Sequence, residues 1–141
     1  MTLNMEPHFT LNDEAFELQF NSGVMPPELF THEAHSRLAW IHLKKYGVEQ
    51  AVKNVCTQLQ HYTALLGASD KYHETLTIAA VRAVHHFMLK TECDDFQGFI
   101  NDNPRLKYNF KDLIFQHYAT DILISETARK TYLEPELLPF D

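Results

Sequence analysis

Three histidines in the segment 31–43 have a spacing that would place them together on one helix face. At about 100° per residue, His32, His35 and His42 fall on one narrow arc between apolar neighbours. A buried imidazole must form a hydrogen bond, pair with a charge or ligate a metal, because an unsatisfied buried polar group costs roughly 1–3 kcal/mol. The segment therefore predicts a site on an inward helix face, without specifying a reaction.

Two further histidines are predicted to face inward from other helices. His73 opens the buried face of a helix expected at about 71–91, and His117 lies on the apolar face of a later helix. Side chains three residues apart are neighbours on a helix, so His32 and His35 can each give a nitrogen to one metal at about 2.0–2.1 Å. We predict a metal site of His32, His35 and His73, with His117 as a candidate fourth ligand. Zinc, nickel or iron would suit imidazole ligands.

The sequence leaves open whether such a centre would be catalytic. A metal with an open coordination position activates a bound water, and Glu74 or Tyr72, beside His73, would then shuttle a proton. The run from His32 to His35 is not the H-E-x-x-H of zinc proteases, because its second histidine comes one residue early. No Glu-x-x-His occurs, which argues against a carboxylate-bridged di-iron bundle.

Two other interpretations stay open beside the metal site. The inward histidines and tyrosines could form a hydrogen-bonded polar layer in a homodimer or interaction module, anchored by Trp40 and Phe140. Alternatively, Trp40, Tyr46, Tyr72 and Phe87 could line a pocket for a small organic ligand. The three interpretations differ in what the inward side chains contact.

Three long amphipathic helices are expected to position these side chains. They span about 26–46, 48–66 and 71–91, and short turns that contain Gly47 and Gly67 separate them. The projection places Glu33, Arg37 and Lys44 on the outer side of the first helix. Short connections imply antiparallel neighbours, so we predict an all-α bundle of three long antiparallel helices completed by shorter C-terminal helices.

The chain of 141 residues is predicted to form one helical domain over 1–141. Its first part, 1–25, is expected to be irregular apart from a short helix over about 14–20, which Asn12 or Asp13 could cap. The segment 132–141 contains prolines that stop a helix, so we expect an extended tail there.

Composition excludes several partners. Twelve basic against nineteen acidic residues give a formal charge of −7, and the basic residues are scattered, so neither nucleic acid nor an anionic membrane is an expected partner. The two cysteines, Cys56 and Cys93, lack metal or disulfide spacing and fit a reducing compartment. No apolar run has membrane-spanning length. We expect a cytoplasmic protein.

Two motifs carry a resemblance to a known family. The segment 30–40, read as F-x-H-x-x-H, and the segment 71–77, which contains Y-H-E-T-L-T, together resemble a widespread family of small uncharacterised bacterial helical proteins. Asn103-Pro104 and the C-terminal Leu-Glu-Pro extend the resemblance to about 30–135. The resemblance implies positions for a site but no reaction. A looser analogy, at the level of architecture, is to DinB-like bundles, which hold a metal with three histidines from two helices.

Overall fold

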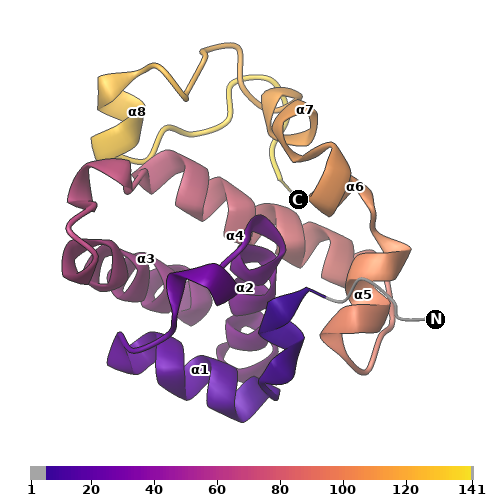
Figure 1. The fold of residues 1–141 in the computed structure, drawn as a ribbon. Helices are drawn as coiled ribbons and strands as arrows, with labels where there is room; N and C mark the ends of the chain where they lie inside the picture. Colours follow the sequence, from indigo (N-terminus) through magenta and orange to yellow (C-terminus); the bar gives the residue numbers. More distant parts are fainter. Residues whose placement is uncertain (1–5, 141) are drawn as a thin grey trace.

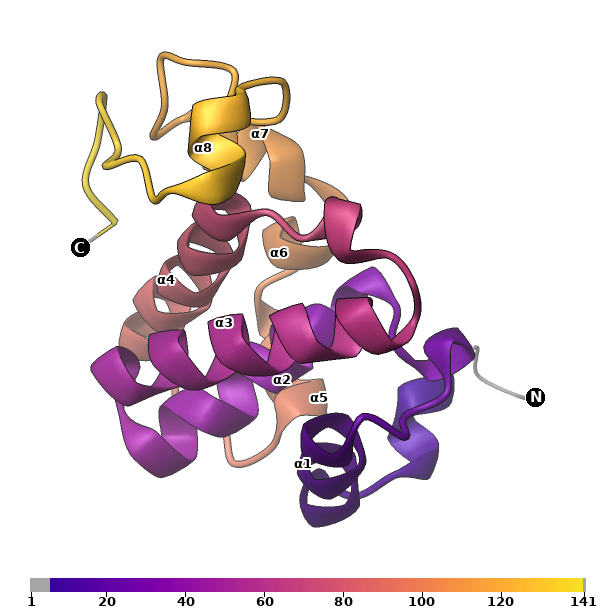
Figure 2. The same ribbon diagram turned by 90° about the vertical axis from the view of Figure 1, so that its left-hand side faces the viewer.

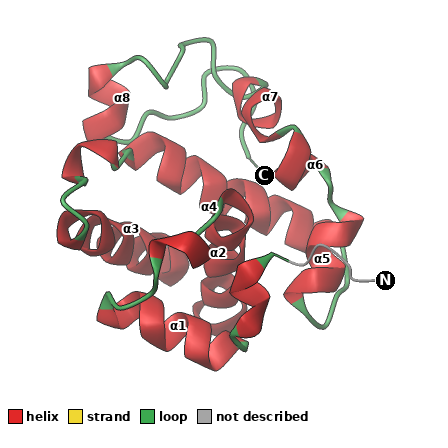
Figure 3. Ribbon diagram, in the orientation of Figure 1, coloured by secondary structure: helices red, strands yellow, loops and turns green. Residues whose placement is uncertain are grey.

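The computed structural model describes residues 6–140, and every regular element in that range is helical (Figures 1 and 3). The α-helices are α1 (Asp13–Ser22), α2 (His32–Tyr46), α3 (Val48–Leu65), α4 (Glu74–Lys90), α5 (Phe96–Asp102), α6 (Arg105–Tyr108), α7 (Phe110–Phe115) and α8 (Glu126–Lys130). Three 3₁₀ turns precede longer helices, namely η1 (Pro7–Thr10), η2 (Pro27–Leu29) and η3 (Ser69–Lys71). The predicted all-α class is confirmed.

The helices α2 and α3 form a tight hairpin at the centre of the bundle. A single residue, Gly47, separates them and has a φ of 82°. Few residues other than glycine adopt this conformation, and here it reverses the chain at the predicted position. The two helices therefore lie against each other and run in opposite directions (Figure 2).

The helix α4 packs across both α2 and α3. The shorter helices cover the remaining sides of this group of long helices. α7 and α8 contact α4, whereas α6 contacts α2 and α1 contacts both α2 and α3 (Figures 1 and 2). Fully buried apolar side chains fill the shared core, including Leu38, Val81, Val84, Leu106 and Ile114. Within the described residues, no helix combines the length and the apolar character that crossing a bilayer requires.

Several helix boundaries differ from the predicted ones. α2 begins at His32 rather than near Pro26, because the Thr31 side chain caps it by accepting a hydrogen bond from the Ala34 amide at 3.3 Å. α4 begins at Glu74 rather than near residue 71. α7 ends at Phe115, so His117 lies in the connection that follows this helix.

The outer side of α2 is buried, contrary to the sequence prediction. Glu33 and Arg37 are each only 4% exposed, because the N-terminal residues 6–13 lie over this side of the helix. Lys44, further along the helix, is exposed as predicted. The N-terminal segment thus covers one side of α2, and His32 and His35 lie on the opposite side of this helix.

Candidate ligand-binding cavity

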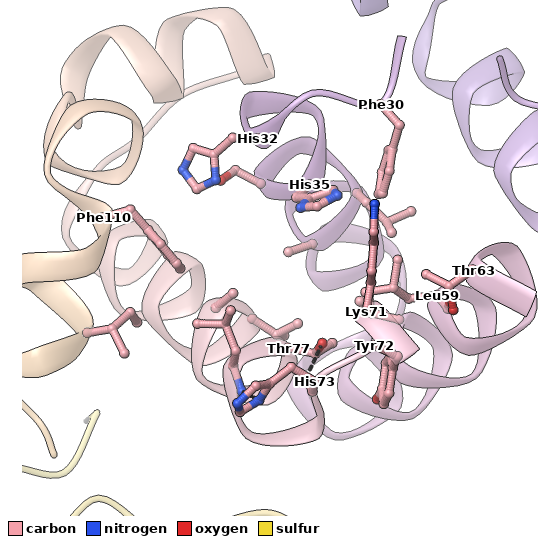
Figure 4. A pocket seen from close by; sticks show the side chains of 18 of the residues that line it. Phe30, His32, His35, Leu59, Thr63, Lys71, Tyr72, His73, Thr77 and Phe110 are labelled. Atoms are coloured by element: carbon pink, nitrogen blue, oxygen red, sulfur yellow. Dashed lines mark hydrogen bonds between the residues drawn. The ribbon is translucent and has the colours of Figure 1, made fainter. Parts of the chain in front are cut away.

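A cavity of about 550 Å³ lies between α2, α3, α4 and α7 (Figure 4). Its walls are mostly apolar and include Leu59, Leu76, Val81, Val84 and Ile114. Protein interiors are otherwise close-packed, with few voids larger than a water molecule. Binding pockets for small molecules measure about 300–1,000 Å³ and have such apolar walls. The cavity is therefore the candidate functional site.

His35 presents its ring to the cavity from the first turn of α2 (Figure 4). The ring lies 4.0 Å, between centroids, from the ring of Phe30. No residue in the range 6–140 forms a hydrogen bond with it, and its side chain is exposed at the open side of the cavity although protein atoms are dense around it. Burial, followed by the nearby charge of His32, lowers the pKa of His35 to about 4. At neutral pH the imidazole is therefore uncharged, with one donor and one acceptor nitrogen available.

His32 lies on the same wall and is anchored through one nitrogen. Its Nε2 is 2.9 Å from the carbonyl oxygen of Leu106, which can only accept, so Nε2 carries the hydrogen. The ring also meets the edge of Phe110 at 4.9 Å between centroids. The Nδ1 atom has no partner among the described residues. The predicted juxtaposition of His32 and His35 is therefore present, and both face the cavity.

His73 lines the opposite wall, but both of its ring nitrogens are engaged (Figure 4). Its Nδ1 accepts a hydrogen bond from the Leu76 amide at 3.0 Å and so caps the start of α4. Its Nε2 donates to the carbonyl oxygen of Ile122 at 2.7 Å. With neither nitrogen available to a metal, His73 fastens the start of α4 to the connection after α7.

His117, the fourth predicted ligand, lies outside the cavity. Its Nδ1 donates to the Leu138 carbonyl oxygen at 2.8 Å, and its ring stacks on Phe140 with 4.0 Å between centroids. The structure therefore does not bring the four predicted ligands to one point. Only His32 and His35 combine a place on the cavity wall with unengaged ring nitrogens.

The predicted proton shuttles, Tyr72 and Glu74, are paired with each other. The Tyr72 hydroxyl donates to Glu74 Oε1, while the tyrosine ring lines the cavity and Glu74 does not. Burial, followed by the neighbouring Cys56 and Glu74, raises the pKa of Tyr72. The Tyr72 hydroxyl thus stays protonated, and its O–H group points toward Glu74 rather than into the cavity.

The aromatic residues predicted to form a pocket or a partner surface are placed differently. Of Trp40, Tyr46, Tyr72 and Phe87, only Tyr72 lines the cavity. Trp40 is buried in the core, and the Tyr46 hydroxyl bonds to Glu17 across α1. Phe140, the other predicted anchor, is 5% exposed and packs against its own chain. The cavity is instead lined largely by aliphatic residues of the amphipathic helices, such as Leu59, Leu76 and Ile114.

A second cluster, which the sequence did not suggest, contains Glu6, His8 and Glu33. Their potential ligand atoms lie within 4.8 Å of one another. Arg37 can only donate, so His8 Nδ1 accepts from it at 3.2 Å, and His8 Nε2 donates to Glu33 at 2.6 Å. Lys107 approaches Glu33 at 2.9 Å. Because these cations already balance the carboxylates, the cluster is best explained as a network that holds the N-terminal segment on α2.

Two charged residues of the cavity were not predicted as site residues. Lys71, from η3, and Lys111, from α7, both line the cavity and are exposed. Nothing in the local sequence distinguishes them from ordinary surface lysines, since only the fold brings η3 and α7 to the same opening. They give the rim of the cavity a positive charge.

The two motifs noted in the sequence meet at this cavity. Phe30, His32 and His35 of the first motif form one wall, and Tyr72, His73, Leu76 and Thr77 of the second form another (Figure 4). The residues of both motifs are thus also residues of the candidate site. Comparison with family models, curated proteins and solved structures finds no match to this chain.

Proposed function

We propose that this protein binds a small, largely apolar organic molecule in the cavity between α2, α3, α4 and α7. The observation that carries the proposal is the cavity itself, about 550 Å³ within apolar walls that also hold two imidazoles with unengaged nitrogens. The cavity opens to solvent at the exposed residues His32, His35 and Lys71, so its apolar walls meet water at a cost of about 25 cal/mol per Å². A bound apolar molecule would recover that cost by contact with the walls, while the imidazoles would orient its polar end.

The proposal is for binding rather than catalysis. The proton shuttles predicted from the sequence are committed elsewhere, since Tyr72 donates to Glu74 and Glu74 does not line the cavity. His35 is left as a neutral hydrogen-bonding group. A neutral hydrogen-bonding group in an apolar cavity is sufficient to bind and orient a ligand.

Calorimetric titration with 1-decanol tests the proposal directly. We expect saturable binding with a negative heat-capacity change, because apolar surface is removed from water. A free decanol concentration of one hundred times Kd should stabilise the fold by about 2.7 kcal/mol. That gain corresponds to a rise in melting temperature of roughly 5–10 °C.

A variant that fills the cavity makes the test specific. Ala80 lines the cavity from α4, so Ala80→Trp should abolish decanol binding while circular dichroism shows an intact helical fold. Ala64→Trp places the same side chain on the exposed face of α3 and should bind as the parent does. Equal binding by both variants, or no binding by the parent, would refute the proposal.

A metal held by His32 and His35 is a second candidate, favoured by the two neighbouring rings that face the cavity with unengaged nitrogens. Two protein ligands leave positions for a bound molecule or water, and zinc, nickel or iron would suit imidazole. Elemental analysis of protein prepared without an affinity tag should then show near-stoichiometric metal. His35→Ala should lose it, and a metal-free parent protein would exclude this candidate.

We also infer that the protein works in a reducing compartment, the cytoplasm. Cys56 and Cys93 are both free thiols in the structure. Cys56 is buried, and burial raises its pKa to about 11, so it packs as a small apolar side chain.

A further inference from the structure

The residues that line the cavity have a charge opposite to that of the chain as a whole. The chain carries nineteen acidic and twelve basic residues. The described residues that line the cavity include Lys71 and Lys111 but no aspartate or glutamate. An uncharged ligand would not require a positively charged cavity in an acidic protein, whereas a negatively charged ligand would be attracted by it.

The two lysines are available to a ligand. Neither forms an ion pair or a hydrogen bond with any residue in the range 6–140. Two lysines elsewhere on the surface are instead committed to ion pairs, since Lys45 bonds to Glu17 at 2.6 Å and Lys107 to Glu33 at 2.9 Å. An ammonium group at the opening of an apolar cavity attracts an anionic group and leaves the apolar part of the same molecule to the interior.

One of these lysines lies toward the same end of the cavity as the unengaged imidazole. Figure 4 shows the Lys71 side chain extending from η3 toward the end that carries Phe30 and His35. The ring of His35 carries at least one N–H group in either protonation state, and no residue in the range 6–140 accepts a hydrogen bond from it. A carboxylate or phosphate oxygen at this end would meet both the Lys71 cation and the N–H donor of His35.

We propose that the ligand is an amphiphilic organic anion, with its charged group between Lys71 and His35 and its hydrocarbon chain along Leu59, Leu76 and Ile114. This inference rests on the proposed function and names the class of molecule that the cavity takes. A hydrocarbon chain suits the aliphatic walls, and a single anionic group suits the positive rim. A cationic amphiphile would place its charge against two unpaired ammonium groups.

Four probes with the same ten-carbon chain separate charge from hydrophobicity. We would titrate decanoate, decyl phosphate, 1-decanol and decyltrimethylammonium into the protein at pH 7 below their micellar concentrations. Decanoate or decyl phosphate should bind about tenfold more tightly than decanol, as expected for one charge-assisted hydrogen bond. The tighter of the two anions identifies the head group. Each methylene removed from decanoate should weaken binding about fourfold.

Substitutions of single lysines test whether the positive rim of the cavity causes the preference for anions. Lys71→Gln should weaken decanoate binding about tenfold and decanol binding much less, so that the two affinities converge, and Lys71→Arg should largely restore the preference for decanoate. Lys53→Gln removes an exposed lysine of α3 that does not line the cavity, and it should change neither affinity. Circular dichroism checks that each variant keeps its fold.

The possible failures are distinguishable. If decanol and the cation bind as tightly as the anions, the cavity is an apolar site and the anion inference is wrong, while the proposed function stands. If Lys71→Gln lowers the affinities for decanol and decanoate by the same factor, Lys71 does not recognise the anionic group, and this inference is again wrong. If none of the four probes binds, both the inference and the proposed function fail.

Discussion

His35 is the titratable side chain that should report most directly on the cavity. Its folded-state pKa of about 4 lies below the value of 6.5 for an unperturbed histidine, so only the unfolded chain gains this proton between those values. Stability should therefore fall as the pH decreases from 6.5 toward 4. In His35→Leu this part of the decrease should disappear, and urea unfolding between pH 7 and pH 4.5 measures the difference.

The control for this prediction is His61→Leu, which removes an exposed histidine of α3. The parent and the control should show the same dependence on pH, and His35→Leu should show a weaker one. Three parallel curves would mean that the His35 ring is already solvated like that of an unfolded chain.

At the scale of residues, local spacing predicted part of the candidate site. His32 and His35 are three apart on a helix, so their common wall follows from the sequence alone. The cavity that this wall borders does not, because its other walls come from α4 and α7. Glu33 was wrongly placed in solvent for the same reason. Its partners, His8 and Lys107, are far away in sequence, and no pattern within α2 indicates them.

At the scale of elements, His73 should act as a cap that also ties α4 to the connection after α7. His73→Ala removes the cap to Leu76 and the bond to Ile122, so it should lower the free energy of unfolding by about 2 kcal/mol. His73→Asn can still cap the helix and should cost about half as much. Urea unfolding in the presence of EDTA measures both without any contribution from metal. Equal losses, or none, would contradict the dual role.

Helix starts could be predicted where a preferred capping residue stands at the boundary. Asn12, Asp95 and Ser125 are of the preferred capping types, and each side chain accepts an amide hydrogen bond in the structure. The start of α4 was displaced because histidine is not among the usual capping residues, whereas Ser69 and Asp70 are. His73 nonetheless caps, since its Nε2 bond to Ile122 leaves Nδ1 as an acceptor.

At the scale of the whole molecule, an all-α bundle follows from three long apolar stripes and short glycine turns. The position of the N-terminal segment does not follow from them. Arg37 holds this segment through the carbonyl oxygens of His8 and Leu11, at 2.7 and 2.8 Å, and through Asp13 at 2.8 Å. By covering one side of α2, the segment makes that helix part of the interior and leaves its histidine face for the cavity.

Arg37→Met should therefore destabilise the whole fold. The change keeps the apolar stem but removes every bond to residues 8–13, so we expect a loss of about 3 kcal/mol in the free energy of unfolding. Arg37→Lys should recover little, because an ammonium group cannot reproduce the planar fork. Arg129→Met is the matched control: its ion pair with Glu126, at 3.5 Å on the surface, should contribute less than 1 kcal/mol. Equal losses in Arg37→Met and Arg129→Met, measured by urea unfolding, would show that the N-terminal segment adds nothing to the stability of the bundle.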